Sequence, residues 1–394
     1  MTVSPSFARE EAEKVGIETR RASARAKIKL LVFGVDDDPQ LFDDIEQFKE
    51  EHYAYDNGNW GVDAGRLIPS ELLLPGGIVC KVHIRPGSPL RIRKAESNLV
   101  VQNAGNVISE AALLPRPTFW QHNTNSGKPT KRLAHFYGAT CLNFNIYSGC
   151  QFYDVGKPCR FCSVQPTQAL HRGVEVHKSK TDLADTCALA VKHDRVEWIL
   201  ATGGSHLNGD AEFDAHVSVL HAVQEHLPWE GRFRGNLSLM PPKNLDRLDE
   251  LHELGVDHPS FNLEAWPQNA FERICPGKAE YVGFDHIMSA YDRIVDLYGS
   301  GSAWCNFVGG LVPLEDQMDG FTAMAKRGVI PGANIYHPDV KSPFGASIPS
   351  PGEDYIVRLY RHAAELYHKY GFKPFFDSAV LRNSLANEAY EDLI

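Results

Sequence analysis

The stretch CLNFNIYSGCQFYDVGKPCRFC, residues 141–162, decides the fold and raises the question of the chemistry. An apolar, β-rich run comes first, and three cysteines follow it with the spacing C-x8-C-x2-C. These cysteines are Cys150, Cys159 and Cys162. In parallel βα folds the reactive face lies at the carboxyl ends of the strands. We therefore expect the three thiols on that face.

From about residue 137, apolar β-rich runs alternate with stretches of helical period. The β-rich runs are CLNFNIYS, VEWILAT, NLSLM, SFNLEAW, SAWCNFVGGLV and VIPGANIY, and each is followed by an amphipathic stretch such as KTDLADTCALAVKH. Six βα units in succession indicate a parallel sheet with crossover helices. Six units suit a partial TIM-like (β/α)6 barrel better than the complete eight.

The flanking segments lack this alternation of β-rich and helical stretches. Residues 1–135 read as an N-terminal α+β accessory region, in which a charged helical opening and the acidic run 36–51 precede short strand-like pieces broken by turns. The barrel is expected over 136–372. The polar and aromatic tail, 373–394, is expected either to cap the barrel or to pack on the surface. The fold class is thus α/β, with an accessory region and a C-terminal extension.

Composition narrows the class of protein. The 394 residues carry a net charge of −10, and no basic run is interleaved with aromatic residues, which argues against a nucleic-acid partner. No stretch approaches the roughly 18 apolar residues of a membrane span, and we expect no membrane partner. The charged, Ala-rich start argues against a secretory signal. A cytoplasmic protein with reduced cysteines is the expectation.

The cysteine loop is most simply a metal site, because soft thiolates select zinc, copper(I) or iron–sulfur clusters. A structural zinc needs a fourth thiolate or imidazole, for which Cys141 and His171 are the local candidates. A strand starting at Cys141 would hold its thiol ~20 Å from the loop, and His171 follows Cys162 at no common zinc-finger spacing. Three cysteines fit a [4Fe–4S] cluster with one open iron. A zinc-stapled α/β binding protein is the alternative.

The arrangement resembles the radical S-adenosylmethionine (SAM) superfamily, in which a three-cysteine loop follows the first strand of a (βα)6 barrel. The commonest spacing in that family is C-x3-C-x2-C. This chain keeps C-x2-C with an aromatic residue, Phe161, before the last cysteine, and it widens the first gap to eight residues. Longer first gaps occur in some branches, so this departure bears on the subfamily.

Later strand ends resemble the biotin-synthase-like branch. The resemblance implies that a glycine pair and a serine after the second strand face the methionyl amino group of SAM. An asparagine and a glutamate of the fourth strand contact its ribose or methionyl groups. Glycines of the fifth strand and the loop IYHPDVKSPFG after the sixth lie beside the adenosine. With Phe161, the expected SAM contacts are Gly203, Gly204, Ser205, Asn262, Glu264, Gly309, Gly310 and His337.

The resemblance further implies an enzyme that reductively cleaves SAM at a [4Fe–4S] cluster to a 5′-deoxyadenosyl radical, which abstracts hydrogen from a substrate. A flavodoxin or ferredoxin would supply the electron. The sequence shows no second cysteine cluster and no cobalamin-type domain, which favours a small-molecule substrate and a rearrangement, fragmentation or C–C bond formation in cofactor or natural-product biosynthesis. A peptide or carrier-bound substrate is the alternative.

Two residues are the candidate catalytic groups. Cys275 lies just beyond the fourth strand and could present a thiol to the substrate, although an inert thiol is the simpler interpretation. His206 lies two residues after the glycine pair and could donate a proton, although a loop histidine without a role fits as well. The four other cysteines are expected to pack as small hydrophobic residues: Cys80, Cys141, Cys187 and Cys305.

Overall fold

The computed structural model describes residues 15–36, 71–95, 98–170, 175–230, 232–374 and 380–394. Most of the acidic run 36–51, the first 14 residues and His171 therefore lie outside the described residues. The strands are β1 (Glu71–Leu74), β2 (Ile78–Lys81), β3 (Leu90–Ala95), β4 (Asn98–Asn103), β5 (Asn106–Ala111), β6 (Ala134–Tyr137), β7 (Cys141–Asn145), β8 (Trp198–Thr202), β9 (Phe233–Ser238), β10 (Val256–Ser260), β11 (Ala303–Gly309) and β12 (Val329–Ile335).

The helices lie mostly after β6. They are α2 (Ile17–Phe33), η2 (Thr118–Gln121), η3 (Thr130–Arg132), α3 (Gln151–Asp154), α4 (Val164–Leu170), α5 (Lys180–His193), α6 (Gly209–Gln224), η4 (Leu245–Leu248), α7 (Asp249–Glu253), α8 (Gln268–Ile274), α9 (Pro276–Tyr281), α10 (Phe284–Tyr298), α11 (Leu314–Lys326), α12 (Glu353–Tyr370) and α13 (Ala386–Tyr390).

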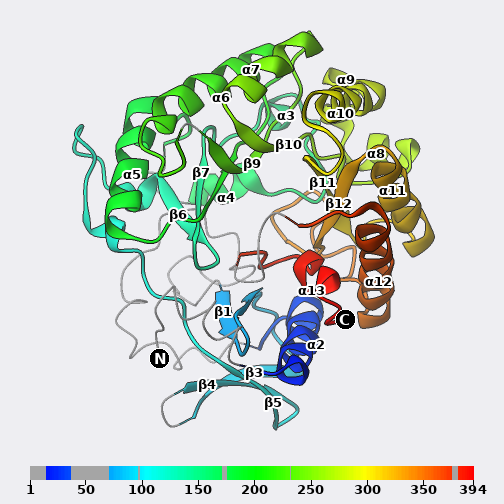
Figure 1. Cartoon of the computed structure of the whole chain (residues 1–394). Helices are drawn as coiled ribbons and strands as arrows, with labels where there is room; N and C mark the ends of the chain where they lie inside the picture. Colours follow the sequence, from blue (N-terminus) through cyan, green and yellow to red (C-terminus); the bar gives the residue numbers. More distant parts are fainter. Residues whose placement is uncertain (1–14, 37–70, 96–97, 171–174, 231, 375–379) are drawn as a thin grey trace.

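Parallel strands follow one another in sequence order through the second half of the chain. β7, β8, β9 and β10 form a parallel sheet, and β6 adds an antiparallel edge to β7. Beyond β10 the chain continues to pair with β11, because the Glu264 N–H donates to the Asn306 carbonyl at 3.1 Å. β11 pairs in parallel with β12. The α/β class with a parallel sheet is confirmed, and helices α5, α6, α7, α10, α11 and α12 lie outside the strands (Figure 1).

Burial explains why these segments adopt these structures. All five residues of β7 are buried, as expected for a strand covered on both faces. α5 begins and ends with the predicted stretch KTDLADTCALAVKH, and Leu183, Cys187 and Ala190 form its buried stripe. The third and fourth strands were predicted too late in the chain. β9 and β10 begin at Phe233 and Val256, ahead of NLSLM and SFNLEAW.

The N-terminal segments form smaller antiparallel sheets. β1 pairs with β2, and β3, β4 and β5 form a three-stranded sheet that lies at the bottom of Figure 1. α2 contacts β2 and β5. α2 ends at Phe33, and Gly34 follows it with a positive φ of 63°. One continuous group of buried apolar residues joins this region to the parallel strands and the tail.

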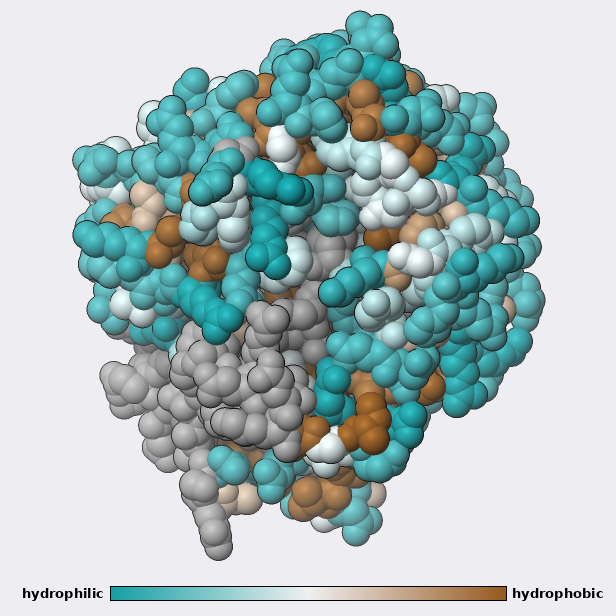
Figure 2. All heavy atoms as spheres, in the orientation of Figure 1, coloured by the Kyte–Doolittle hydropathy of each residue, from teal (hydrophilic) through white to brown (hydrophobic). Residues whose placement is uncertain are grey.

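The tail enters the body of the protein instead of lying on its surface. The Ile335 N–H at the end of β12 donates to the Asn383 carbonyl at 3.0 Å, and the Lys81 N–H of β2 donates to the Arg382 carbonyl at 2.9 Å. The described part of the tail therefore lies between β12 and β2, and α13 lies beside α2 (Figure 1). The surface in Figure 2 is largely hydrophilic, with small scattered apolar patches. Among the described helices, none combines the length and apolarity needed to cross a bilayer.

Candidate active site

The cysteine loop follows β7 directly. Cys150 caps the start of α3, and the Cys162 N–H donates to the Cys159 carbonyl at 3.0 Å in a tight turn. Cys150 is 9% exposed, and the other two are half-buried. Burial raises the pKa of the Cys150 and Cys162 thiols, and a negative charge at Cys159 raises both further. The three thiols therefore lie close enough to influence one another electrostatically.

The segment after β8 packs directly beneath this loop. The Gly204 N–H donates to the Tyr147 carbonyl at 2.8 Å, and the Gln151 N–H donates to the Ser205 carbonyl at 2.8 Å. A Cβ atom at Gly204 would lie 1.6 Å from the Gly149 carbonyl oxygen and 3.0 Å from the Cys150 Cβ. Glycine is required at 204 because the backbone of the cysteine loop approaches so closely. The predicted glycine pair is thus placed beside the first cysteine of the loop.

The donor set of the loop fits an iron–sulfur cluster. All eight cysteines are free thiols. Across the described ranges, no three His, Cys, Asp or Glu side chains gather around one point as the ligands of a single ion do. A [4Fe–4S] cluster gives each cysteine its own iron, so its ligands need not converge in that way. Backbone N–H groups also face the sulfurs, and that of Val164 lies 3.5 Å from Cys162 Sγ.

The opposite side of the loop faces the segment that follows β10. The Arg160 N–H donates to the Ile274 carbonyl at 2.9 Å and the Gly277 N–H donates to the Lys157 carbonyl at 3.0 Å, so the segment that carries Cys275 lies against the loop. The ammonium of Lys278, buried at 6% exposure, donates to Glu264 Oε1 at 2.6 Å and to the Asn262 carbonyl at 2.9 Å. The structure therefore brings Glu264, one of the predicted SAM contacts, to the cysteine loop, already paired with a cation.

A cavity of about 180 Å³ lies among the strands. Strands β6, β8, β9, β11 and β12, the segment after β10 and the tail all contribute to it, so they surround it. Its described lining is uncharged and rich in amides and hydroxyls: Tyr137, Leu200, Thr202, Asn236, Ser238, Asn262, Trp304, Asn306, Asn334, Leu381 and Ser384. This is where the structure offers room and hydrogen-bonding groups for a small molecule.

At the wall of this cavity, Asn262 connects the segment after β10 to β9 and to β11. Its Nδ2 donates to Ser238 Oγ at 3.0 Å, and its Oδ1 accepts the Asn306 N–H at 2.9 Å. Asn262 and Glu264 are half-buried between the buried residues Phe261 and Leu263, as the predicted strand alternation requires. Asn262 thus organises the wall of the cavity, whereas the side chains of Asn306 and Asn334 make no hydrogen bond to another described residue.

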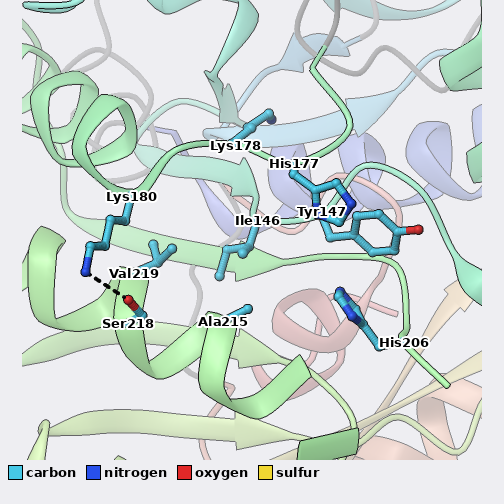
Figure 3. Close-up of a pocket in the computed structure, with 9 residues that line it drawn as sticks. All are labelled: Ile146, Tyr147, His177, Lys178, Lys180, His206, Ala215, Ser218 and Val219. Carbon is cyan, nitrogen blue, oxygen red and sulfur yellow. Dashed lines mark hydrogen bonds between the residues drawn. The ribbon is translucent and has the colours of Figure 1, made fainter. Parts of the chain in front are cut away.

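His206 lies in a different pocket, of about 200 Å³, whose lining shares no residue with the strand-enclosed cavity. Its ring centroid lies 4.7 Å from that of Tyr147, and Tyr147 stacks on His177 at 4.6 Å. Figure 3 shows the three rings on one side of the pocket. On the other side, Lys180 donates a hydrogen bond to Ser218. Burial lowers the pKa of the His206 imidazole. His206 therefore lies in the segment that packs against the loop at Cys150, but outside the strand-enclosed cavity.

The remaining predicted contacts lie at the ends of β11 and β12. Gly310 has a φ of 106°, and a Cβ there would lie 2.8 Å from Pro351, so the tight packing of this loop explains the glycine. The Gly309 carbonyl accepts the Tyr336 N–H at 2.9 Å. His337 stacks on His83 of the N-terminal region at 3.7 Å, and burial lowers its pKa to about 3. Phe161 is half-buried against the main core.

Several residues near the loop were not predicted. Glu212 of α6 is 1% exposed and accepts the backbone N–H groups of His206 and Met240 at 2.9 and 2.8 Å, so it fixes the loop after β8 to the end of β9. Tyr147 and Lys278 were also missed. No local pattern marks these residues, because their partners are distant in sequence. The four cysteines expected in the core, Cys80, Cys141, Cys187 and Cys305, are each fully buried.

No protein-family model matches the chain. A curated relative, bacteriochlorophyllide c C-7(1)-hydroxylase of Chlorobaculum limnaeum, is 26% identical over 262 residues, which are 62% of this chain and 64% of the relative. The match therefore spans a little under two thirds of that relative's length.

Two solved structures represent the structural neighbours. Methylornithine synthase is 14% identical with a TM-score of 0.43, covering 62% of this chain and 71% of that one. A radical SAM methyltransferase from Sphaerobacter thermophilus is 14% identical with a TM-score of 0.43, covering 76% of this chain and 82% of that one.

Proposed function

We propose that this protein is a radical SAM enzyme in which Cys150, Cys159 and Cys162 hold a [4Fe–4S] cluster. The observation that carries the proposal is that the loop with the three cysteines directly follows β7, with Gly204 packed against its backbone beside Cys150. We further propose that the six parallel strands form a partial (β/α)6 barrel over residues 136–372. The residues of β6, β8, β9, β11 and β12 that line one cavity support this fold.

SAM would bind between the cysteine loop and the strand ends. Asn262 and Glu264 share one face of the chain after β10, and Lys278 holds the Glu264 carboxylate in an ion pair at 2.6 Å. Ser205 lies on the other side of the loop, hydrogen-bonded to Gln151. These residues would orient SAM on the open iron. When bound, the cluster and SAM supply a carbon-centred radical, with an electron from a flavodoxin- or ferredoxin-type donor.

The substrate would be a small molecule in the cavity among the strands. Its wall is uncharged, and the amides of Asn306 and Asn334 can orient a ligand by hydrogen bonds. The enclosure matters for the chemistry, because a primary carbon radical attacks C–H bonds within reach and must be kept from stray donors. The name of the curated relative describes hydroxylation of a biosynthetic small molecule, which supports attack on a C–H bond in cofactor biosynthesis.

Leu381 and Ser384 contribute to the same wall, so the tail, 373–394, would act as a cap that completes the substrate cavity. Tyr360 Oη, which also donates to the Ala333 carbonyl, lies 3.0 Å from Ser384 Oγ. This contact fixes the tail serine against β12. The residues of this chain would therefore bind and orient SAM and the substrate and exclude water from the cavity.

The test is anaerobic purification, followed by measurement of iron and sulfide and by addition of dithionite and SAM. We expect about four irons per chain and formation of 5′-deoxyadenosine. Cys159→Ala should abolish SAM cleavage. Cys187→Ala is the control, because Cys187 is also a free thiol but lies on α5 within the core, away from the cysteine loop.

Two results would refute the proposal. The first is a colourless protein with about one zinc, which would instead support the zinc-stapled binding protein. The second is SAM cleavage that survives in Cys159→Ala, which would refute the ligand assignment even in a protein that contains iron.

A further inference from the structure

The pocket that contains His206 is positively charged. Two lysines and two histidines line it, and its described lining includes no carboxylate. The Lys178 ammonium donates to the Leu133 carbonyl at 3.0 Å, and the Lys180 ammonium donates to Ser218 Oγ at 3.3 Å, so the printed partners of both lysines are uncharged. The whole chain carries a net charge of −10, and the pocket therefore differs in sign from the protein around it.

Backbone hydrogen bonds fix this pocket beside the cysteine loop. The segment that precedes α5 pairs with the chain that leaves β7, because the Ser148 N–H donates to the Val176 carbonyl at 2.7 Å and the Lys178 N–H donates to the Ile146 carbonyl at 3.2 Å. Cys150 follows Ser148 by two residues. The wall of the pocket and the start of the cysteine loop are therefore one continuous stretch of backbone.

The edge of the pocket is open to solvent. His177 and Lys180 are exposed, and the apolar side chain of Val176 is 37% exposed. We call these three residues the pocket rim. Beneath the rim, the buried ring of Tyr147 stacks on that of His177 (Figure 3). Tyr147 itself lies three residues before Cys150, so a short bonded path joins the rim to the first cysteine of the loop.

A cluster at the cysteine loop must receive its electron from a carrier that comes close to the loop. Encounters between redox proteins use small interfaces, and complementary charges bring the two partners together and orient them. A carrier with an acidic surface is repelled by this negatively charged chain as a whole. Positive charge beside the loop makes its approach favourable at that place, and the rim supplies this charge through Lys180.

On the basis of the function proposed above, we propose that the pocket rim, Val176, His177 and Lys180, is the docking surface for a protein electron carrier with an acidic surface. A carboxylate of the carrier pairs with Lys180, and the carrier's apolar groups contact Val176. One electron leaves the reduced carrier and enters the cluster, so the carrier is oxidised and the cluster is reduced by one electron. The pocket of His206 thereby serves electron uptake, in place of the proton donation expected from the sequence.

The experiment measures 5′-deoxyadenosine formation by the reconstituted protein with two reductants in parallel. One is a flavodoxin with its NADPH-dependent reductase, and the other is dithionite, which needs no docking surface. We expect Lys180→Glu to lower the flavodoxin-driven rate about tenfold, because it reverses the charge that steers the carrier. The dithionite-driven rate should stay at the wild-type value. Lys180 is the first residue of α5, where glutamate is favourable, so the variant should fold.

The matched control is Lys192→Glu. Lys192 is exposed and lies in the last turn of the same helix, ~18 Å from Lys180 along its axis. The substitution changes the net charge of the protein equally but leaves the rim intact, so the flavodoxin-driven rate should remain close to that of the wild type. Added salt should slow the flavodoxin-driven reaction of the wild type more than that of Lys180→Glu, because it screens the exposed charges.

Four results would overturn the inference. An unchanged flavodoxin-driven rate in Lys180→Glu would show that the carrier does not use the rim. Equal losses in Lys180→Glu and Lys192→Glu would assign the effect to net charge. An equal loss with dithionite would mean that Lys180 acts on the cluster or on SAM. A wild type that reacts with dithionite but not with flavodoxin would exclude an acidic carrier.

Failure of the proposed function itself gives a different result. A wild-type protein without iron, or one that forms no 5′-deoxyadenosine with dithionite, would refute the radical SAM activity and this inference with it. Neither of these two measurements involves the carrier, so they separate that case from failure of the docking surface alone.

Discussion

The ammonium of Lys27 in α2 lies 2.8 Å from the carboxylate of Glu388 in α13, and neither side chain is exposed to solvent. The two residues are 361 positions apart. The same ammonium donates to the Leu381 carbonyl at 2.6 Å, and Leu381 is one of the residues that line the cavity among the strands. This buried ion pair therefore ties the N-terminal region to the tail at the point where the tail reaches the candidate substrate site.

Lys27→Met should destabilise the protein strongly. Removal of one partner leaves the Glu388 carboxylate buried without its counter-charge, which typically costs about 3–5 kcal/mol. The measurement is urea unfolding followed by circular dichroism. Adding Glu388→Leu to Lys27→Met should recover part of this loss, because the unpaired charge is then absent.

The matched control for this pair lies two residues further along α2. Lys29 pairs with Glu353 at 2.8 Å, but both side chains are about one third exposed, and such pairs contribute less than about 1 kcal/mol. Lys29→Met should therefore change stability little. Equal losses in Lys27→Met and Lys29→Met would show that burial of the first pair has no energetic consequence.

Sequence periodicity predicted those elements whose burial follows a regular stripe. α5 and β8 lie where the pattern put them, because their apolar residues repeat at the helical or strand period. β10 was placed too late, since its sequence VDHPS contains a proline and polar residues and resembles a turn. Its pairing with β9 makes it a strand, and that contact lies outside the local sequence.

The residues of the candidate site also fall into those that the sequence could predict and those that it could not. The three cysteines could be predicted because they are close in sequence and their spacing carries the chemistry. The neighbours of the loop could not. Cys275 and Lys278 belong to a segment that lies near the loop only because the chain after β10 folds back against residues 157–160, through contacts between segments more than 100 positions apart. Their roles depend on tertiary packing, which no single-sequence pattern encodes.

Gly204→Ala should prevent cluster binding while the rest of the fold remains. The added methyl group would lie 1.6 Å from the Gly149 carbonyl oxygen, so the backbone that presents Cys150 must move. We expect less than half of the wild-type iron after reconstitution, with unchanged far-ultraviolet circular dichroism. Gly352→Ala is the control, because φ at Gly352 is −71° and nothing lies within 4 Å of its added Cβ. Full iron content in Gly204→Ala would contradict the predicted role of this close contact.

Glu212 should make stability fall as the pH rises through neutrality. Burial raises the pKa of its carboxyl from 4.5 to about 7, although the N–H groups of Met240 and His206 partly oppose this. Between these two values the folded protein holds a proton that the unfolded chain has lost. The stabilisation is therefore complete below about pH 4.5 and is lost as the pH approaches and passes 7. The difference corresponds to about 3 kcal/mol.

The measurement compares the wild type with Glu212→Gln by urea unfolding at pH 5 and pH 8. Glutamine cannot titrate, so the wild type should lose about 2–3 kcal/mol more than the variant between these two pH values. Buried His216 and half-buried His258, whose pKa burial lowers to about 4, act with the opposite sign below pH 6.5, but they occur in both proteins and cancel in the comparison. Equal pH dependence in the two proteins would mean that Glu212 is ionised at pH 5 in the folded state. The two N–H donors would then outweigh burial, and the loop after β8 would be held by a carboxylate throughout this range.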